Sequence, residues 1–273
     1  MDIANELNCF TTRLAREPAV LVTVEATQGS VPREAGAWMA VFAQEVIGTI
    51  GGGHVEFTAI EEARRRLHGD AGDPVRRYAL GPSLGQCCGG VVHLRFETMG
   101  AADAARLQQR LAPSWSPVAL FGGGHVGRAI VAALAPLPFE LTWIDSRDEI
   151  FPPEAAANVR CEHSDPVQAA VGDLPAGASV LVMSFSHAED LDVVGACLAR
   201  QRQRGDLAFI GLIGSKSKWA TFRHRLAERG FAETELAQVT CPIGLAGIAG
   251  KEPAVIAASV AAQLLQRRGQ RAP

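Results

Sequence analysis

Several patterns that would place a chain in a special class are missing from this sequence of 273 residues. No apolar run reaches the roughly 18 residues that a membrane-spanning helix needs. The first residues show no basic region followed by an apolar run, which would mark a secretory signal. The six cysteines include no C-x-x-C motif, which excludes the usual zinc spacing and a disulfide framework for a small secreted domain. These absences predict a reduced, cytoplasmic protein without a membrane partner.

The sequence also has no large excess of positive or negative charge. The formal net charge is -3, and arginines are interleaved with acids, as in the run 61–66, so no nucleic-acid-binding surface is expected. Aromatic residues make up only 6% of the chain and no low-complexity tract interrupts it, whereas hydrophobic residues make up 48%. This composition is that of a soluble protein with a substantial core, long enough for one large domain or two ordinary ones.

The clearest domain boundary is the segment 112–117, in which two prolines bracket small polar residues. It predicts an N-terminal domain at 1–112 and a C-terminal domain at 117–273. In the N-terminal part we expect helices at 3–16 and 53–66 and strands at 19–26, 37–42, 45–50, 75–80 and 91–97. Strands mixed with a few helices indicate a small α+β domain.

The C-terminal part alternates strands with helices. We expect strands at 118–121, 141–144, 159–163, 179–184, 208–213 and 239–241, and helices at 125–135, 191–203, 216–229 and 253–267. The run 179–184 is almost wholly apolar, as a buried parallel strand would be. The alternation predicts a Rossmann-like, doubly wound parallel sheet, so the chain is expected to be of the α/β class.

The pentapeptide Gly-Gly-Gly-His-Val occurs twice, and its second copy follows an expected strand. That copy completes G-x-G-x-x-G with Gly122, Gly124 and Gly127. In a dinucleotide-binding turn these glycines allow the tight turn, the approach of backbone to a phosphate, and the packing of helix on strand. Asp145 ends the next expected strand, where a carboxylate can accept hydrogen bonds from a ribose. The pattern favours a dinucleotide-type fold and leaves open whether NAD(P), another nucleotide or none is bound.

The first copy of the pentapeptide contains Gly51, Gly52, Gly53 and His54, and the chain continues to Glu56. Imidazole and carboxylate fall within one helical turn, so they could form a ligand pair or an acid–base pair. The structural alternative is that Glu56 accepts hydrogen bonds from free N–H groups while His54 packs locally. A carboxylate in the first turn opposes phosphate binding, so this loop is not simply a second pyrophosphate site.

Adjacent cysteines, Cys87 and Cys88, are followed by Gly89 and Gly90. A loop with so few side chains can approach a ligand closely. Thiolates are natural ligands of soft metals and natural carriers of sulfur. The alternative is a pair of reduced cysteines at a strand edge.

A further strand-to-helix turn should reach the carboxyl edge of the parallel sheet, where ligands gather in such folds. His187 and Asp190 lie in this turn and should face the same crevice as Gly124. In the structural alternative, Ser186 and Glu189 form an S-x-x-E capping box. Both interpretations can hold at once.

Together these motifs resemble the xanthine dehydrogenase accessory protein family, which includes maturation factors of carbon monoxide dehydrogenase. The resemblance spans nearly the whole chain in one order and is strongest to the xanthine dehydrogenase branch. It rests on G-S-V-P-R at 29–33, I-G-G-G-H-V-E at 50–56, G-Q-C-C-G-G at 85–90, F-G-G-G-H-V-G at 121–127, S-H at 186–187, G-L-I-G-S-K at 211–216, C-P-I-G-L at 241–245 and G-K-E-P-A at 250–254.

The resemblance implies a chaperone of molybdenum cofactor rather than an enzyme. Such proteins bind the Mo-molybdopterin form as cargo, protect it, allow sulfur from a cysteine desulfurase to replace an oxo ligand, and insert it into apo xanthine dehydrogenase. Those two proteins and the proteins of molybdenum cofactor biosynthesis are the implied partners. Cys88 is the better candidate for a metal ligand, with Cys87 and His54 beside it, because relatives often keep only the second cysteine. Relatives also often carry cysteine in place of His54, which weakens the case that a thiol is needed there.

Under this resemblance the turn at Gly122 would hold the phosphate end of the pterin or an auxiliary nucleotide. Two other functions stay open. An NAD(P)-dependent oxidoreductase would use His187 as its acid–base group and Asp145 on the ribose, and it would leave the Cys-Cys loop without a role. A nucleotide-sensing binding module would need no catalytic residue. A homodimer would match the symmetry of a dimeric client enzyme, although no residue pattern decides it.

Overall fold

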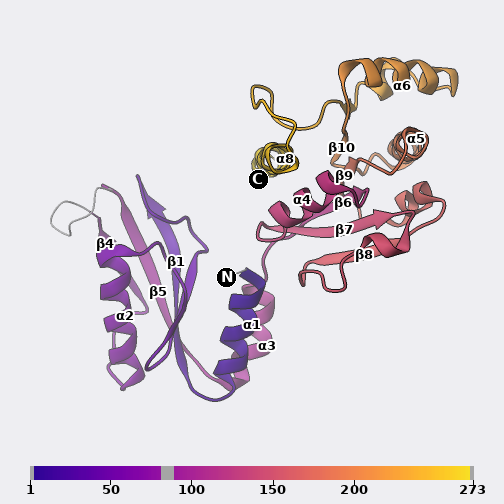
Figure 1. Ribbon diagram of the computed structural model, residues 1–273. Coiled ribbons are helices and arrows are strands. Elements are labelled where there is room, and N and C mark those ends of the chain that lie inside the picture. Colours follow the sequence, from indigo (N-terminus) through magenta and orange to yellow (C-terminus); the bar gives the residue numbers. More distant parts are fainter. Residues whose placement is uncertain (1–2, 81–88, 271–273) are drawn as a thin grey trace. The chain divides into compact units, whose positions relative to one another are not determined.

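The computed structural model describes residues 3–80 and 89–270, which divide into two compact units, Met1–Pro113 and Ser114–Pro273 (Figure 1). Each unit has its own sheet and its own core. The first sheet is antiparallel and the second is parallel. This arrangement confirms the fold class that the sequence predicts, a Rossmann-like sheet preceded by a smaller α+β domain.

The first unit is a five-stranded sheet in the order β3-β2-β1-β5-β4. Its elements are α1 (Ile3–Leu14), β1 (Ala19–Gln28), β2 (Trp38–Val41), β3 (Val46–Gly48), α2 (Gly53–Leu67), β4 (Val75–Ala79), β5 (Val91–Met99) and α3 (Ala104–Arg110). The central strand β1 is buried on both faces because apolar side chains occupy successive positions. Val20 and Val22 pack in the cluster that includes α2, and Leu21 packs in the cluster that includes α1 and α3.

The second unit is a six-stranded parallel sheet in the order β11-β10-β9-β6-β7-β8. Its elements are β6 (Ser116–Phe121), α4 (His125–Leu134), β7 (Phe139–Asp145), β8 (Val159–His163), β9 (Ser179–Val182), α5 (His187–Arg204), β10 (Phe209–Leu212), α6 (Lys216–Glu228), α7 (Glu233–Leu236), β11 (Val239–Thr240) and α8 (Pro253–Gly269). Helices α4 and α8 lie side by side on one face, and α5 and α6 cover the other (Figure 1). The strand order reverses between β6 and β9, which places the ligand crevice of such folds at their carboxyl ends.

One helix differs clearly from the expectation. Helix α5 begins at His187, whereas the apolar periodicity predicts a start near 191. The capping alternative explains the difference, because the hydroxyl of Ser186 accepts a hydrogen bond from the N–H of Glu189 at 3.2 Å. The cap therefore extends the helix by one turn toward the crevice.

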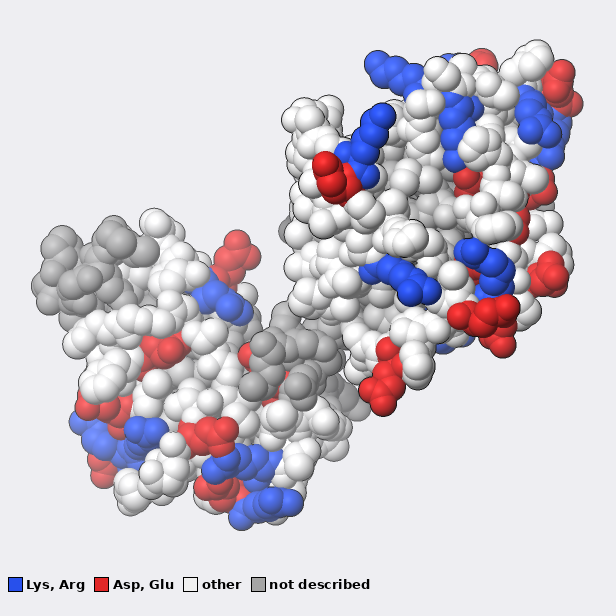
Figure 2. Space-filling view, in the orientation of Figure 1, with Lys and Arg blue, Asp and Glu red and all other residues white. Residues whose placement is uncertain are grey.

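On the face drawn in Figure 2, basic and acidic side chains are interspersed over both units. The structure also contains ion pairs such as Arg110–Glu97 and Arg202–Glu235. Among residues 3–80 and 89–270, no helix combines the length and apolar character that crossing a bilayer requires.

Candidate functional site

The turn between β6 and α4 is shaped by two glycines that no other residue can replace. Gly122 has a φ of 124°, and a Cβ there would lie 2.0 Å from the carbonyl oxygen of Met183. A Cβ on Gly127 would lie 2.0 Å from the carbonyl oxygen of Gly122. Gly124 instead caps α4, and a Cβ on it would meet nothing within 4 Å. The tight turn and the close helix–strand packing expected from the sequence are thus confirmed, and Gly124 faces open space.

Asp145 lies at the end of β7, and the backbone of the glycine turn contacts its buried carboxylate. One carboxylate oxygen accepts from the backbone N–H of Gly123 at 2.6 Å and from the guanidinium of Arg147 at 2.9 Å. The other oxygen accepts from the backbone N–H and Nε of Arg147 at 2.9 and 2.8 Å. These four bonds fill the lone-pair sites of a carboxylate. The ribose-binding role predicted for Asp145 therefore stays a prediction that would require Arg147 to move away.

The same contacts perturb the acidity of Asp145. Burial alone would raise the pKa of this carboxyl, but the hydrogen bonds from Arg147 and Gly123 outweigh it and hold the pKa below the ordinary value. Because the pKa is lower in the folded state, the charged carboxylate stabilises the fold above the unfolded-state pKa. That contribution is lost as the pH falls through the lowered pKa.

We expect Asp145→Asn to lower the free energy of unfolding at neutral pH by about 2–3 kcal/mol, because an amide nitrogen cannot accept these bonds. The variant should also lose part of the acid sensitivity of the wild type below about pH 5. Urea unfolding at a series of pH values measures both effects. Glu154→Gln, at an exposed position of the same unit, is the matched control and should change neither. Equal pH dependence in wild type and Asp145→Asn would contradict the account.

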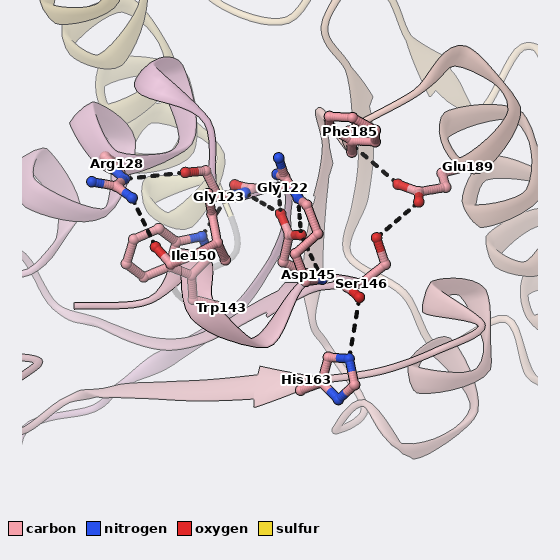
Figure 3. A network of polar contacts seen from close by, with 11 residues as sticks. Gly122, Gly123, Arg128, Trp143, Asp145, Ser146, Ile150, His163, Phe185 and Glu189 are labelled. Atoms are coloured by element: carbon pink, nitrogen blue, oxygen red, sulfur yellow. Dashed lines mark hydrogen bonds and ion pairs between the residues drawn. The ribbon is translucent and has the colours of Figure 1, made fainter. Parts of the chain in front are cut away.

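A polar network continues from Asp145 along the carboxyl edge of the sheet (Figure 3). The guanidinium of Arg147 stacks 4.3 Å from the ring centroid of Phe185, which is 67% exposed. Glu189 links the turn after β7 to the turn after β9. Its carboxylate accepts hydrogen bonds from the Ser146 hydroxyl at 2.8 Å and from the Phe185 N–H at 3.1 Å. Beside this network is an open pocket of about 300 Å³, lined by Gly123, Gly124, His125, Arg128, Arg147 and Ile150. Its position at the start of α4 suits an anion.

The two residues expected to face this crevice as reactive groups have different surroundings. His187 is exposed, with its ring centroid 6.3 Å from that of Phe222. In the part of the chain that the structure describes, no group forms a hydrogen bond with its imidazole. Asp190 is buried and accepts from Lys218 Nζ at 2.6 Å and from the Ser184 N–H at 2.7 Å. Asp190 therefore fixes two turns, and no group with a described position orients His187 for acid–base work.

In the first unit, the carboxylate of Glu56 accepts hydrogen bonds from the loop that precedes α2. Its carboxylate accepts from the Thr49 hydroxyl and from the backbone N–H groups of Ile50 and Gly52, the latter two at 2.9 and 3.0 Å. The geometry matches the structural alternative for Glu56, because its oxygen takes the place that an external anion would need. His54 is exposed at the start of α2. The loop thus presents an imidazole outward and keeps the carboxylate inside.

The segment 29–33 joins two motifs that are far apart in the sequence. A Cβ on Gly51 would lie 2.5 Å from the Cβ of Pro32, and a Cβ on Gly90 would lie 2.4 Å from the carbonyl oxygen of Ser30. The first glycine cluster and the end of the Cys-Cys loop therefore pack against the same short segment. Cys87 and Cys88 themselves lie outside the described residues. Their assignment as ligands stays a prediction.

Beyond the paired residues of β4 and β5, the Leu80 N–H donates to the Gly90 carbonyl oxygen at 2.8 Å. Among the residues with described positions, no group of three or more His, Cys, Asp or Glu side chains could hold a metal ion. His54 thus has no described set of co-ligands.

The two glycines after the cysteines should respond differently to a methyl group. We expect Gly90→Ala to lower the stability of the first unit by about 1–3 kcal/mol, because its Cβ would collide with two carbonyl oxygens, at 2.4 and 2.5 Å. Gly89→Ala should be nearly neutral, because no atom of the residues that the structure describes lies within 4 Å of its Cβ. Thermal unfolding of both variants measures the difference. Equal losses would show that segment 29–33 does not support the loop.

Arg33 is one residue of this region that sequence reasoning did not select for the site. It is exposed, and a Cβ on Gly51 would lie 3.1 Å from its side chain. Within residues 3–80 and 89–270 its guanidinium has no hydrogen-bond or ion-pair partner. Its place in the G-S-V-P-R motif is the signal that could have singled it out.

The fold and the site define a two-unit protein in which a thiol-bearing α+β unit precedes a Rossmann-like unit. Residues 118–264 match the model of the XdhC Rossmann domain, and residues 13–79 match that of the XdhC and CoxI family. The chain belongs to the XdhC family. This confirms the resemblance seen in the sequence.

Two known proteins are similar to this chain over most of its length. The uncharacterized protein YqeB of Escherichia coli (strain K12) is 28% identical over 274 residues, covering 95% of this chain and 46% of that protein. The chain thus spans about half the length of this curated relative. A crystal structure described as a xanthine dehydrogenase from Bacillus halodurans superposes with a TM-score of 0.81 at 18% identity, covering 100% of this chain and 97% of that one. The latter similarity shows the fold.

Proposed function

We propose that this chain carries molybdenum cofactor, in the Mo-molybdopterin form, as cargo during the maturation of xanthine dehydrogenase. The observation that carries the proposal is the packing of segment 29–33 against both Gly51 and Gly90. It brings the first glycine cluster, with His54 outward, next to the root of the loop that contains Cys87 and Cys88. Thiolates are suitable ligands for a soft metal centre and suitable acceptors of sulfur.

Charge at this end of the unit supports an anionic cargo. Arg33 is exposed beside the glycine cluster, and a guanidinium binds phosphate or other anions through paired N–H groups. Glu34, the residue after Arg33, is also exposed, whereas Glu56 is already engaged with backbone N–H groups of its own loop. In the proposal Cys88 is the principal ligand, Cys87 and His54 line the metal end, and a cysteine desulfurase supplies sulfur while the cofactor is held.

The second unit would supply an anion site of its own, for the phosphate of an auxiliary nucleotide. Gly124 faces open space at the start of α4, where free N–H groups favour an anion. Apo xanthine dehydrogenase and the proteins of cofactor biosynthesis are the proposed partners. The alternative of an NAD(P)-dependent oxidoreductase is less well supported, because Arg147 fills the acceptors of Asp145 and His187 has no described orienting group.

Cofactor retention tests the proposal. Purified protein is mixed anaerobically with molybdenum cofactor, free ligand is removed by gel filtration, and molybdenum and pterin are assayed. We expect near-stoichiometric retention by the wild type and a loss of at least about tenfold in Cys88→Ala. Cys161→Ala, which removes a half-buried thiol of the second unit, is the control and should retain cofactor. Absence of retention by the wild type, with NAD(P) retained instead, would favour the oxidoreductase.

A further inference from the structure

Lysine is scarce in this chain and gathers in one place. The sequence contains 26 Lys and Arg residues in total, and only three of them, Lys216, Lys218 and Lys251, are lysine. Lys216 and Lys251 line the same pocket. Lys218 Nζ donates to the carbonyl oxygen of Ile213, another residue of the pocket wall, at 2.9 Å. All the other Lys and Arg positions of the chain hold arginine. The compact, localised charge of the lysine ammonium group is therefore concentrated at and beside this pocket.

The pocket lies at the carboxyl end of β10, between the turn that starts α6, the loop 242–251 and the start of α8. Its volume is about 620 Å³, which is enough for a small organic molecule. No Asp or Glu is among the described residues that line it. Most of its wall is apolar, formed by Ile213, Ile243, Leu245, Ile248, Val255 and Ile256.

Buried polar contacts hold the wall in place. The N–H of Gly244 donates to Gln263 Oε1 at 2.9 Å, and the N–H of Leu245 donates to the Ser259 hydroxyl at 2.8 Å. Gln263 and Ser259 are buried on α8. Gly244 has a φ of 99°, and a Cβ there would lie 2.6 Å from the Ser259 hydroxyl. The loop is therefore fixed to the helix by specific bonds, which makes the pocket a built feature of the unit.

The charges that line the pocket are available to a ligand. Lys216 and Lys251 are both exposed, and neither ammonium has a hydrogen-bond or ion-pair partner among the residues that the structure describes. Lys218 differs, because its ammonium is bound to Asp190 at 2.6 Å. Lys216 is also the first residue of α6, a helix of 13 residues. The free backbone N–H groups at the N-terminal end of this helix carry partial positive charge, which adds to the charge of the ammonium groups.

We propose that this pocket binds a phosphorylated small molecule with a largely apolar body. The phosphate is held by Lys216, Lys251 and the start of α6, and the body packs on the isoleucine-rich wall. Two ammonium groups and a helix N-terminus suit a phosphate. The site goes beyond the cofactor carriage proposed above and does not depend on it, because no residue is shared with the thiol-bearing loop.

Pyridoxal 5′-phosphate is a suitable probe because its aldehyde forms an imine with a lysine amine, releasing water, and borohydride reduces the imine to a stable amine. Peptide mapping then locates the label among only three lysines and the N-terminal amine. We expect labelling of Lys216 or Lys251 to saturate near one per chain. Pyridoxine 5′-phosphate, which lacks the aldehyde, should suppress labelling at least about tenfold, whereas pyridoxine should not.

Two outcomes would overturn the proposal. Labelling that rises without saturation and is unaffected by pyridoxine 5′-phosphate would show only the ordinary reactivity of exposed amines. Equal protection by inorganic phosphate at the same concentration would show that the apolar wall contributes nothing.

Variants give a second, non-covalent measurement by equilibrium binding of pyridoxine 5′-phosphate. Ile248→Asp places a negative charge on the pocket wall at a side chain that is 48% exposed, and it should weaken binding at least about tenfold. Leu265→Asp changes an exposed residue of α8 outside the pocket and is the matched control. Unchanged binding in Ile248→Asp would contradict the site. Cys88→Ala should leave this binding intact, so failure here and failure of molybdenum retention are distinguishable.

Discussion

We expect Gly122→Ala to destabilise the second unit by about 3 kcal/mol or more. The added Cβ would lie 2.0 Å from the carbonyl oxygen of Met183, and a φ of 124° is strained for any residue with a side chain. The backbone of Met183 cannot yield easily, because its N–H donates to the Phe121 carbonyl oxygen at 2.8 Å. Urea unfolding followed by fluorescence measures the loss, since three of the four tryptophans lie in this unit.

Gly124→Ala is the matched control for this prediction. Gly124 has a φ of -69°, and its Cβ would meet nothing within 4 Å, so we expect a loss of less than about 1 kcal/mol. The methyl group would, however, project into the space where an anion would approach the start of α4. A large loss in Gly124→Ala, or none in Gly122→Ala, would contradict the assigned geometry of the turn.

Breaking the ion pair between Asp190 and Lys218 should destabilise the second unit by at least as much. Asp190→Leu would leave an ammonium that is 13% exposed without its carboxylate, and we expect a loss of about 3–5 kcal/mol at neutral pH. The change would also free the Ser184 N–H, which donates to Asp190 at 2.7 Å. Chemical denaturation of the purified variant measures the loss.

The double variant Asp190→Leu with Lys218→Met distinguishes a lost charge pair from lost packing. Removing both charges should recover most of the stability, because no unpaired ion remains buried. Asp192→Leu, two residues along the same helix, breaks an exposed pair with Arg229 and should cost less than about 1 kcal/mol. A double variant no more stable than Asp190→Leu would show that the carboxylate acts mainly through the Ser184 turn.

Much of the backbone could be predicted from the sequence because the signals are local. Glycine positions in the turn at Gly122, apolar strands and the Ser186 cap act over a few residues. The division into an α+β unit and a unit with a parallel sheet follows from the change of pattern near 112–117. Helix α5 begins one turn before the residue that hydrophobic periodicity predicts, because the Ser186 cap sets its first residue.

The contacts that each side chain makes could not be predicted, because they depend on which groups meet in space. The sequence indicates that Asp145 can accept hydrogen bonds, but only the structure shows that Arg147 and Gly123 already supply them. In the same way, the lysine pocket joins the turn after β10 to a loop about 30 residues further along the chain. No periodicity connects these segments.

Reconstitution of xanthine dehydrogenase tests the central claim most directly. The protein is loaded anaerobically with sulfurated molybdenum cofactor, freed of excess ligand and mixed with apo xanthine dehydrogenase, and xanthine oxidation is followed. The account predicts activation by the loaded wild type, little activation by Cys88→Ala treated identically, and full activation by Cys161→Ala. Activation no greater than that given by an equal amount of free cofactor would contradict it.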